Sequence, residues 1–137
     1  MYKNLLSILV LCTIFVVLVG CNRGDDNKSE TSKLTEESLK KSPKDSIAYQ
    51  FELLKAGDAA KLKECFTERQ RDRITPEAVE KGKAEASKYT LDDLVNSVED
   101  GEYEGKKTAK IKMKNGRSLT TLIQTEGKWL ADTVWFN

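Results

Sequence analysis

The stretch TAKIKMKNGRSLTTLIQTEGKWLADTVWF, residues 108–136, decides the fold. Its first part alternates apolar and polar residues, so that Ala109, Ile111 and Met113 share one face and the lysines between them share the other. A period of two is typical of a β-strand with one buried face. The sequence therefore predicts a half-buried strand over residues 108–114.

Two turn motifs divide the rest of this stretch. Asn115-Gly116 favours a two-residue hairpin turn, because both residue types tolerate positive φ. We therefore expect the following strand, residues 118–125, to pair back antiparallel. Glu126-Gly127 predicts a second reversal of the same kind.

One further strand is expected on each side of this hairpin. The last strand is predicted over Lys128–Phe136, where apolar residues lie on both sides, so we expect it to be covered on both faces. Val95–Tyr103 is predicted as the opening strand, although Leu91–Val98 also fits the spacing of a helix. These runs together predict an antiparallel sheet of about four strands.

Three helices are predicted before the sheet. Ser42 precedes a proline at the first helical position, and apolar residues then recur at helical spacing until Gly57. Asp58 is placed to cap a second, shorter helix, and Thr75 a third that runs through Ala86. Helices followed by an antiparallel meander define the α+β class.

The N-terminal segment contains Lys3 and then an apolar run, Leu5–Gly20. This run is shorter than the about 20 residues that a membrane-spanning helix needs. A basic start, an apolar middle and small residues at the end are typical of a secretory signal peptide, which we predict over residues 1–20. An uncleaved anchor helix is the alternative.

The end of this run, Leu18-Val19-Gly20-Cys21, resembles the lipobox of bacterial lipoproteins. The resemblance implies cleavage between Gly20 and Cys21 and attachment of a diacylglyceryl group, commonly with a further palmitate-like acyl chain, to Cys21. It implies a lipid-anchored protein that faces outward from the cytosol, with the membrane as a partner. Asn22 follows the cysteine in place of aspartate, which in a host with two membranes is compatible with the outer membrane.

A polar segment separates Cys21 from the predicted helices. Residues 22–44 contain no aromatic residue and only two leucines, so they bury too little apolar surface to offset the entropy of ordering. We predict a flexible tether over 21–44, in which a short helical turn around Leu34–Leu39 is the alternative, and a domain over 45–137.

Charge and rare residues exclude several classes of protein. Lys and Arg number 23 against 22 Asp and Glu, a balance that argues against nucleic acid as a partner. The chain has no histidine, the commonest acid–base catalyst and metal ligand, and we predict no catalytic residue, metal or cofactor. Cys65 has no other cysteine left to pair with once Cys12 is cleaved off and Cys21 is lipidated, and it is predicted to be a core residue.

A second resemblance covers residues 45–136. FELLKAGDAAKLKECFT, together with the stretch quoted first, resembles small exported lipoproteins of the nuclear-transport-factor-2-like superfamily. The resemblance implies a curved sheet that wraps the first helix as a cone and encloses an apolar pocket. The candidate pocket residues are Tyr49, Phe51, Trp129 and Asp132.

Three functions from different classes follow. The first, which we prefer, is a non-catalytic domain that binds a small ligand or an envelope protein. The second is an enzyme in which Asp132 and Tyr49 face one cavity. The third is an assembly module, such as a homodimer, which predicts a broad apolar patch around Trp129, Trp135 and Phe136.

The lysines that follow Gly105 are interpreted as a solvated sheet face; they are Lys106, Lys107, Lys110, Lys112 and Lys114.

Overall fold

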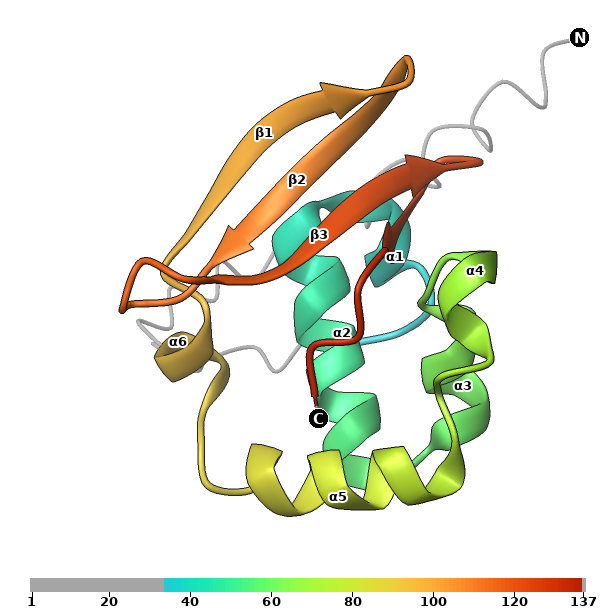
Figure 1. Ribbon diagram of the computed structural model, residues 1–137, viewed down its shortest axis with the longest axis vertical. Coiled ribbons are helices and arrows are strands. Elements are labelled where there is room, and N and C mark those ends of the chain that lie inside the picture. Colours follow the sequence, from blue (N-terminus) through green and yellow to red (C-terminus); the bar gives the residue numbers. More distant parts are fainter. Residues whose placement is uncertain (1–33, 137) are drawn as a thin grey trace, which may run out of the picture. The chain divides into compact units, whose positions relative to one another are not determined.

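The computed structural model describes residues 34–136, which belong to one compact unit of the α+β class (Figure 1). Helices come first along the chain, and a four-stranded antiparallel sheet follows in the order β1-β2-β3-β4, as predicted. The helices are α1 (Ser38–Lys41), α2 (Pro43–Ala56), α3 (Ala59–Glu64), α4 (Glu68–Arg71), α5 (Pro76–Ala86) and α6 (Leu91–Leu94). The strands are β1 (Ser97–Tyr103), β2 (Lys106–Lys112), β3 (Ser118–Thr125) and β4 (Lys128–Ala131).

The three predicted helices are confirmed together with their caps. The Ser42 hydroxyl accepts a hydrogen bond from the N–H of Asp45 at the start of α2, and α2 ends at Gly57 with φ 75°. Asp58 caps α3 and Thr75 caps α5 in the same manner. Local capping chemistry therefore sets these boundaries, because it requires only neighbouring residues.

The N-terminal boundary of the packed domain differs from the prediction. The predicted tether reached Lys44, whereas α1 lies within it and packs on α2 and β4. Leu39 is 1% exposed, and the Lys128 ammonium lies 2.6 Å from a carboxylate oxygen of Glu36. The tether was predicted from the average composition of the segment, and an average does not reveal that one leucine fills the core. The predicted signal peptide, Cys21 and residues 22–33 of the tether lie outside the described residues.

The region of ambiguous periodicity contains both kinds of element. Leu91–Leu94 forms the short helix α6, which a capping box between Thr90 and Asp93 begins. Strand β1 then starts at Ser97 and pairs along its whole length with β2. The opening strand is thus confirmed, with a start two residues later than Val95.

The Asn-Gly hairpin differs from the predicted two-residue turn. That turn requires positive φ at both positions, but only Gly116 has it, with φ 79°. The Gly116 N–H bonds to the Met113 carbonyl, and the Met113 N–H bonds to the Arg117 carbonyl, so the loop holds three residues. A left-handed glycine after an ordinary turn is the usual three-residue hairpin loop. Strand β2 consequently ends at Lys112.

Two-residue turns with positive φ at both positions occur instead at the Glu-Gly pairs. They are Glu104-Gly105, with φ 49° and 74°, and Glu126-Gly127, with φ 51° and 77°. The second is the reversal that the sequence predicted, and it pairs β3 with β4 in register. Glycine supplies one left-handed position at each turn, and glutamate accepts the strain of the other.

The last strand is shorter than predicted, because β4 ends at Ala131. Its outer edge pairs with residues near Phe66: the Ala131 N–H donates to the Cys65 carbonyl, and the Thr67 N–H donates to the Ala131 carbonyl, each at 2.9 Å. The predicted burial on both faces is confirmed for the part that is strand, since Trp129, Leu130 and Ala131 are at most 8% exposed. A chain segment from the helical half thus covers the edge of the sheet.

Helix α2 carries the core beneath β3 and β4 (Figure 1). A buried chain of hydrogen bonds ties it to the sheet: Ser46 Oγ donates to the Trp129 carbonyl at 2.7 Å, and Gln50 Nε2 donates to Ser46 Oγ at 3.2 Å. Trp135 Nε1 donates to Gln50 Oε1 at 3.1 Å. Two of these bonds join α2 to residues far along the sequence, and the third joins residues one turn apart on α2. Helix α2 therefore fixes the position of β4 and of the C-terminal segment.

Candidate functional site

The four candidate pocket residues do not line one cavity. Tyr49, Phe51 and Trp129 belong to the hydrophobic core and are 9%, 2% and 8% exposed. Asp132 lines one of the two surface hollows described below, and the other three candidates line neither of them. The predicted pocket position is therefore occupied by packed side chains.

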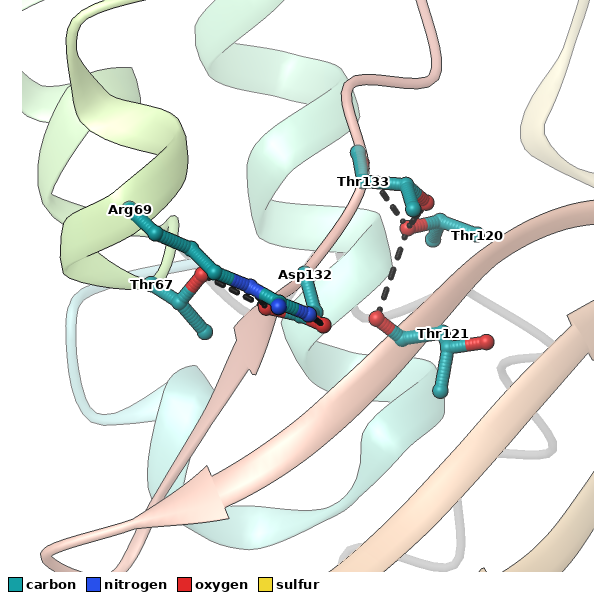
Figure 2. A network of polar contacts seen from close by, with 6 residues as sticks. All are labelled: Thr67, Arg69, Thr120, Thr121, Asp132 and Thr133. Atoms are coloured by element: carbon teal, nitrogen blue, oxygen red, sulfur yellow. Dashed lines mark hydrogen bonds and ion pairs between the residues drawn. The ribbon is translucent and has the colours of Figure 1, made fainter. Parts of the chain in front are cut away.

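Asp132 lies in a cluster with Arg69 and Thr67, which Figure 2 shows from close by. The Thr67 hydroxyl donates to Asp132 Oδ1 at 2.8 Å, and Arg69 Nε donates to the same oxygen at 2.7 Å. Arg69 Nη2 donates to Oδ2, so the ion pair is bidentate. The Asp132 side chain is 10% exposed and that of Arg69 is 65% exposed. A buried carboxylate is thus held by a cation that solvent reaches.

The pairing that the enzyme alternative predicted is absent from this cluster. Asp132 has Arg69 and Thr67 as partners, and within residues 34–136 no hydrogen bond joins it to Tyr49. The hydrogen bond from Arg69 to Asp132 raises the pKa of the guanidinium. Burial raises the pKa of Tyr49, with a smaller effect of the nearby Cys65. The carboxylate therefore acts as an acceptor that orders the start of α4.

Threonines next to the cluster anchor the C-terminal segment to β3 (Figure 2). The Thr120 hydroxyl bonds to the Thr133 carbonyl at 3.0 Å and lies 2.8 Å from the Thr133 hydroxyl. The Asp132 N–H donates to the Thr121 carbonyl. The chain after β4 is thus directed back across α2, which places Val134, Trp135 and Phe136 against α5.

These three residues form one wall of a larger hollow of about 800 Å³, which we call the α5 groove. Its other walls are α5, α6 and the loop between β2 and β3. The apolar residues that line it are Leu54, Gly82, Ala86, Leu94, Met113, Leu119, Val134, Trp135 and Phe136. Gly82 permits the close packing at the base, because a Cβ there would lie 2.6 Å from Phe136 Cδ2. The groove therefore has an apolar floor that backbone proximity shapes.

The polar residues of the groove lie at its rim and bond to neighbours. Asp93 accepts from Thr90 and lies 3.7 Å from the Lys114 ammonium, and the bonds to Thr90 lower the pKa of its carboxyl. Glu85 pairs with Lys88 at 2.7 Å. Arg117 has no ion-pair partner among residues 34–136. The carboxylates of the rim are therefore engaged in local pairs instead of converging on the floor.

The apolar patch predicted by the assembly alternative is largely buried. Trp129 and Phe136 are 8% and 5% exposed. Trp135 is half-buried; it packs edge-on against Phe136 at a centroid distance of 5.3 Å and lines the α5 groove. Because Trp129 and Phe136 are buried, these three aromatic residues form no broad exposed patch.

The lysine-rich strand forms a mixed-charge face. Lys112 lies 3.7 Å from Glu99, which is opposite Lys110 in the register of β1 and β2. Lys110 is exposed and Lys114 pairs with Asp93. These pairs agree with the interpretation of a solvated sheet face.

Residues 34–136 contain one cysteine, Cys65, which is free. Cys65 is 1% exposed, and burial raises the pKa of its thiol to about 12, so it is the inert core residue that the sequence predicted. Between residues 34 and 136, His, Cys, Asp and Glu form no cluster of three with metal-binding geometry. The helices in that range are too short or too polar to cross a bilayer.

No protein-family model, curated protein or solved structure matches this chain. The sequence did not indicate Arg69 as the partner of Asp132, because 63 residues separate them. Nor did it indicate the α5 groove, whose walls come from four separate elements. Both sites depend on tertiary contacts that no local pattern encodes.

Proposed function

We propose that this protein is a lipid-anchored lipoprotein of the cell envelope whose domain binds an apolar small molecule or an apolar segment of a partner protein in the α5 groove. The lipobox-like residues Leu18 to Cys21 support the anchor. The order of elements, with helices first and a meander that packs on the long helix α2, supports a nuclear-transport-factor-2-like architecture.

The apolar floor of the α5 groove is the observation that carries the binding function. Leu119, Met113 and Val134 line the groove and are half-buried, so part of each side chain remains accessible to a ligand. Covering accessible apolar surface with a ligand is favourable by about 25 cal/mol for each Å² that is removed from water. Hollows of this size with apolar linings are the usual sites for small ligands.

The polar rim favours binding over catalysis. Acid–base chemistry requires a carboxylate or phenol directed at the bound ligand, with a pKa suited to proton transfer. The rim carboxylate Asp93 instead caps α6, and its bonds to Thr90 lower its pKa, further from the range suited to proton transfer near neutral pH. Asp132, the acid of the enzyme alternative, lines a different hollow.

Native mass spectrometry of the full chain, purified in a mild detergent, tests the proposal. We expect a retained small molecule or peptide on the wild type. Leu119→Glu places a charge on the floor and should abolish retention, whereas Ala60→Glu on the exposed surface of α3 should not. Equal retention by both variants, or none by the wild type under any gentle condition, would count against the groove as the binding site.

The anchor has its own test, which is independent of the groove. Cells that express the chain are labelled with radioactive palmitate, and wild type is compared with Cys21→Ala. We expect label only on the wild type, with a mature N-terminus at Cys21. Label that persists in the variant, or a mature chain that begins at Met1, would contradict the lipid anchor.

A further inference from the structure

A second hollow of about 600 Å³ surrounds the Arg69–Asp132 pair, and we call it the Arg69 hollow. Three parts of the fold meet there: the start of α4, the turn between β1 and β2, and the end of β3. The residues of these parts that the following argument uses are Arg69, Glu68, Tyr103, Glu104, Lys106 and Thr125. The α5 groove shares none of them.

Tyr103 presents an exposed aromatic ring at this hollow. It is 57% exposed, and in residues 34–136 the one other exposed large apolar side chain is Tyr89, at 47%. A ligand can cover one apolar face of an exposed tyrosine ring while the phenol hydroxyl stays hydrated, so no hydrogen bond to water needs to be lost. A ligand that offers both a flat apolar face and hydroxyl groups at its edges suits such a ring.

Arg69 presents fixed hydrogen-bond donors beside the ring. Its Nε and Nη2 bond to the carboxylate of Asp132, which holds the planar group in one orientation (Figure 2). A guanidinium carries five N–H donors, so the exposed edge of Arg69 keeps donors free for a ligand. The proximity of Tyr103 and Glu104 also raises the pKa of Arg69, which agrees with their position at the same hollow.

The remaining groups supply acceptors and a weakly acidic balance. Glu68 and Glu104 accept hydrogen bonds, and the Thr125 hydroxyl both donates and accepts. Since Arg69 and Asp132 neutralise each other, the hollow is lined by one further cation, Lys106, and two carboxylates. This balance disfavours an anionic ligand, because like charges repel.

We infer that the Arg69 hollow is a binding site for a neutral saccharide, with one sugar ring stacked on Tyr103 and its hydroxyls bonded to Arg69, Thr125 and the two glutamates. A pyranose ring has an apolar C–H face and a hydroxyl edge, which matches an aromatic ring beside fixed polar groups. The carboxylate of Asp132 positions Arg69 for this contact. The site is separate from the α5 groove and does not depend on the function proposed for it.

Saturation-transfer difference NMR on the full chain in lauryldimethylamine oxide, a detergent without a sugar head group, tests this inference. The probes are the tetrasaccharides of glucose, mannose and N-acetylglucosamine, with tetragalacturonate as the anionic comparison. Tyr103→Ala should raise the dissociation constant by about tenfold, whereas Tyr103→Phe keeps the ring and should stay within about twofold. Tyr89→Ala is the matched control, because it removes the other exposed tyrosine, at the α5 groove.

We expect at least one neutral tetrasaccharide to bind with contacts from its ring protons, and Tyr89→Ala to bind it as the wild type does. The inference is overturned if none of the three neutral probes binds at millimolar concentration. It is equally overturned if tetragalacturonate binds more tightly than all of them, or if Tyr103→Ala binds as well as Tyr103→Phe.

Discussion

Replacing Ser46 by alanine tests the buried hydrogen-bond chain that fixes β4 on α2. Ser46 is 0% exposed; its hydroxyl donates to the Trp129 carbonyl and accepts from Gln50. Because ladder bonds alternate along an antiparallel pair that begins at Thr125 and Lys128, the Trp129 carbonyl points away from β3. Ser46 is therefore its partner, and alanine leaves two buried polar groups unsatisfied.

The size of the effect follows from these two groups. Each buried group that loses its partner costs about 1–3 kcal/mol, and the better helix propensity of alanine returns about 0.5 kcal/mol. The two groups together cost about 2–6 kcal/mol, so we expect the free energy of unfolding to fall by at least about 1.5 kcal/mol in Ser46→Ala. At a urea dependence of about 1.5 kcal/mol per M, the unfolding midpoint should fall by at least about 1 M.

Urea unfolding of the full chain, followed by tryptophan fluorescence, measures this shift. Ser87→Ala is the matched control, because the Ser87 hydroxyl also bonds to a carbonyl but is exposed to water. We expect its midpoint to change little. Adding Gln50→Leu to Ser46→Ala removes the stranded amide and should cost less than the sum of the two single changes. Equal midpoints for Ser46→Ala and Ser87→Ala would refute the role assigned to the chain.

Three further changes test other contacts. Gly82→Ala should destabilise the protein by about 1 kcal/mol in thermal or urea unfolding although alanine favours helices, because its Cβ would meet Phe136 at 2.6 Å; a rise in stability would contradict the packing. The Cys65 thiol, with its pKa raised to about 12, should resist iodoacetamide at pH 8 until the chain is unfolded, and rapid labelling of folded protein would show that it is accessible. The hydrogen bond from Lys128 lowers the pKa of Glu36, so the stability that wild type has over Glu36→Gln should be present above about pH 4.5 and disappear as the pH falls below it; a difference in melting temperature that persists in acid would show that the ion pair is not its cause.

Caps and alternation predicted much of the fold because they act over a few residues. Ser42, Gly57 and Thr75 set helix boundaries through bonds to the adjacent helical turn, and the structure has them where the sequence placed them. Leu39 shows where this fails, since a composition average over a polar segment carries no record of one side chain that fills the core. The two-residue turn predicted at Asn115-Gly116 was wrong, because the register of the sheet selected a three-residue loop.

The candidate sites depended on contacts that sequence patterns do not contain. Asp132 became a candidate pocket residue through the family resemblance, and its partner Arg69 lies 63 residues earlier. The enzyme alternative paired Asp132 with Tyr49, and the side chain of Tyr49 instead packs in the core. The α5 groove exists because the bonds of Thr120 to Thr133 turn the last residues toward α5.

Binding of an apolar probe in the α5 groove tests the central claim most directly. Titration of the full chain with the neutral fluorophore N-phenyl-1-naphthylamine should give saturable binding, with energy transfer from Trp135, which lines the groove. Leu119→Glu should weaken this binding by about tenfold or more, and Ala60→Glu should leave it unchanged. Binding that is absent from the wild type, or that both variants retain equally, would contradict a ligand site in the groove.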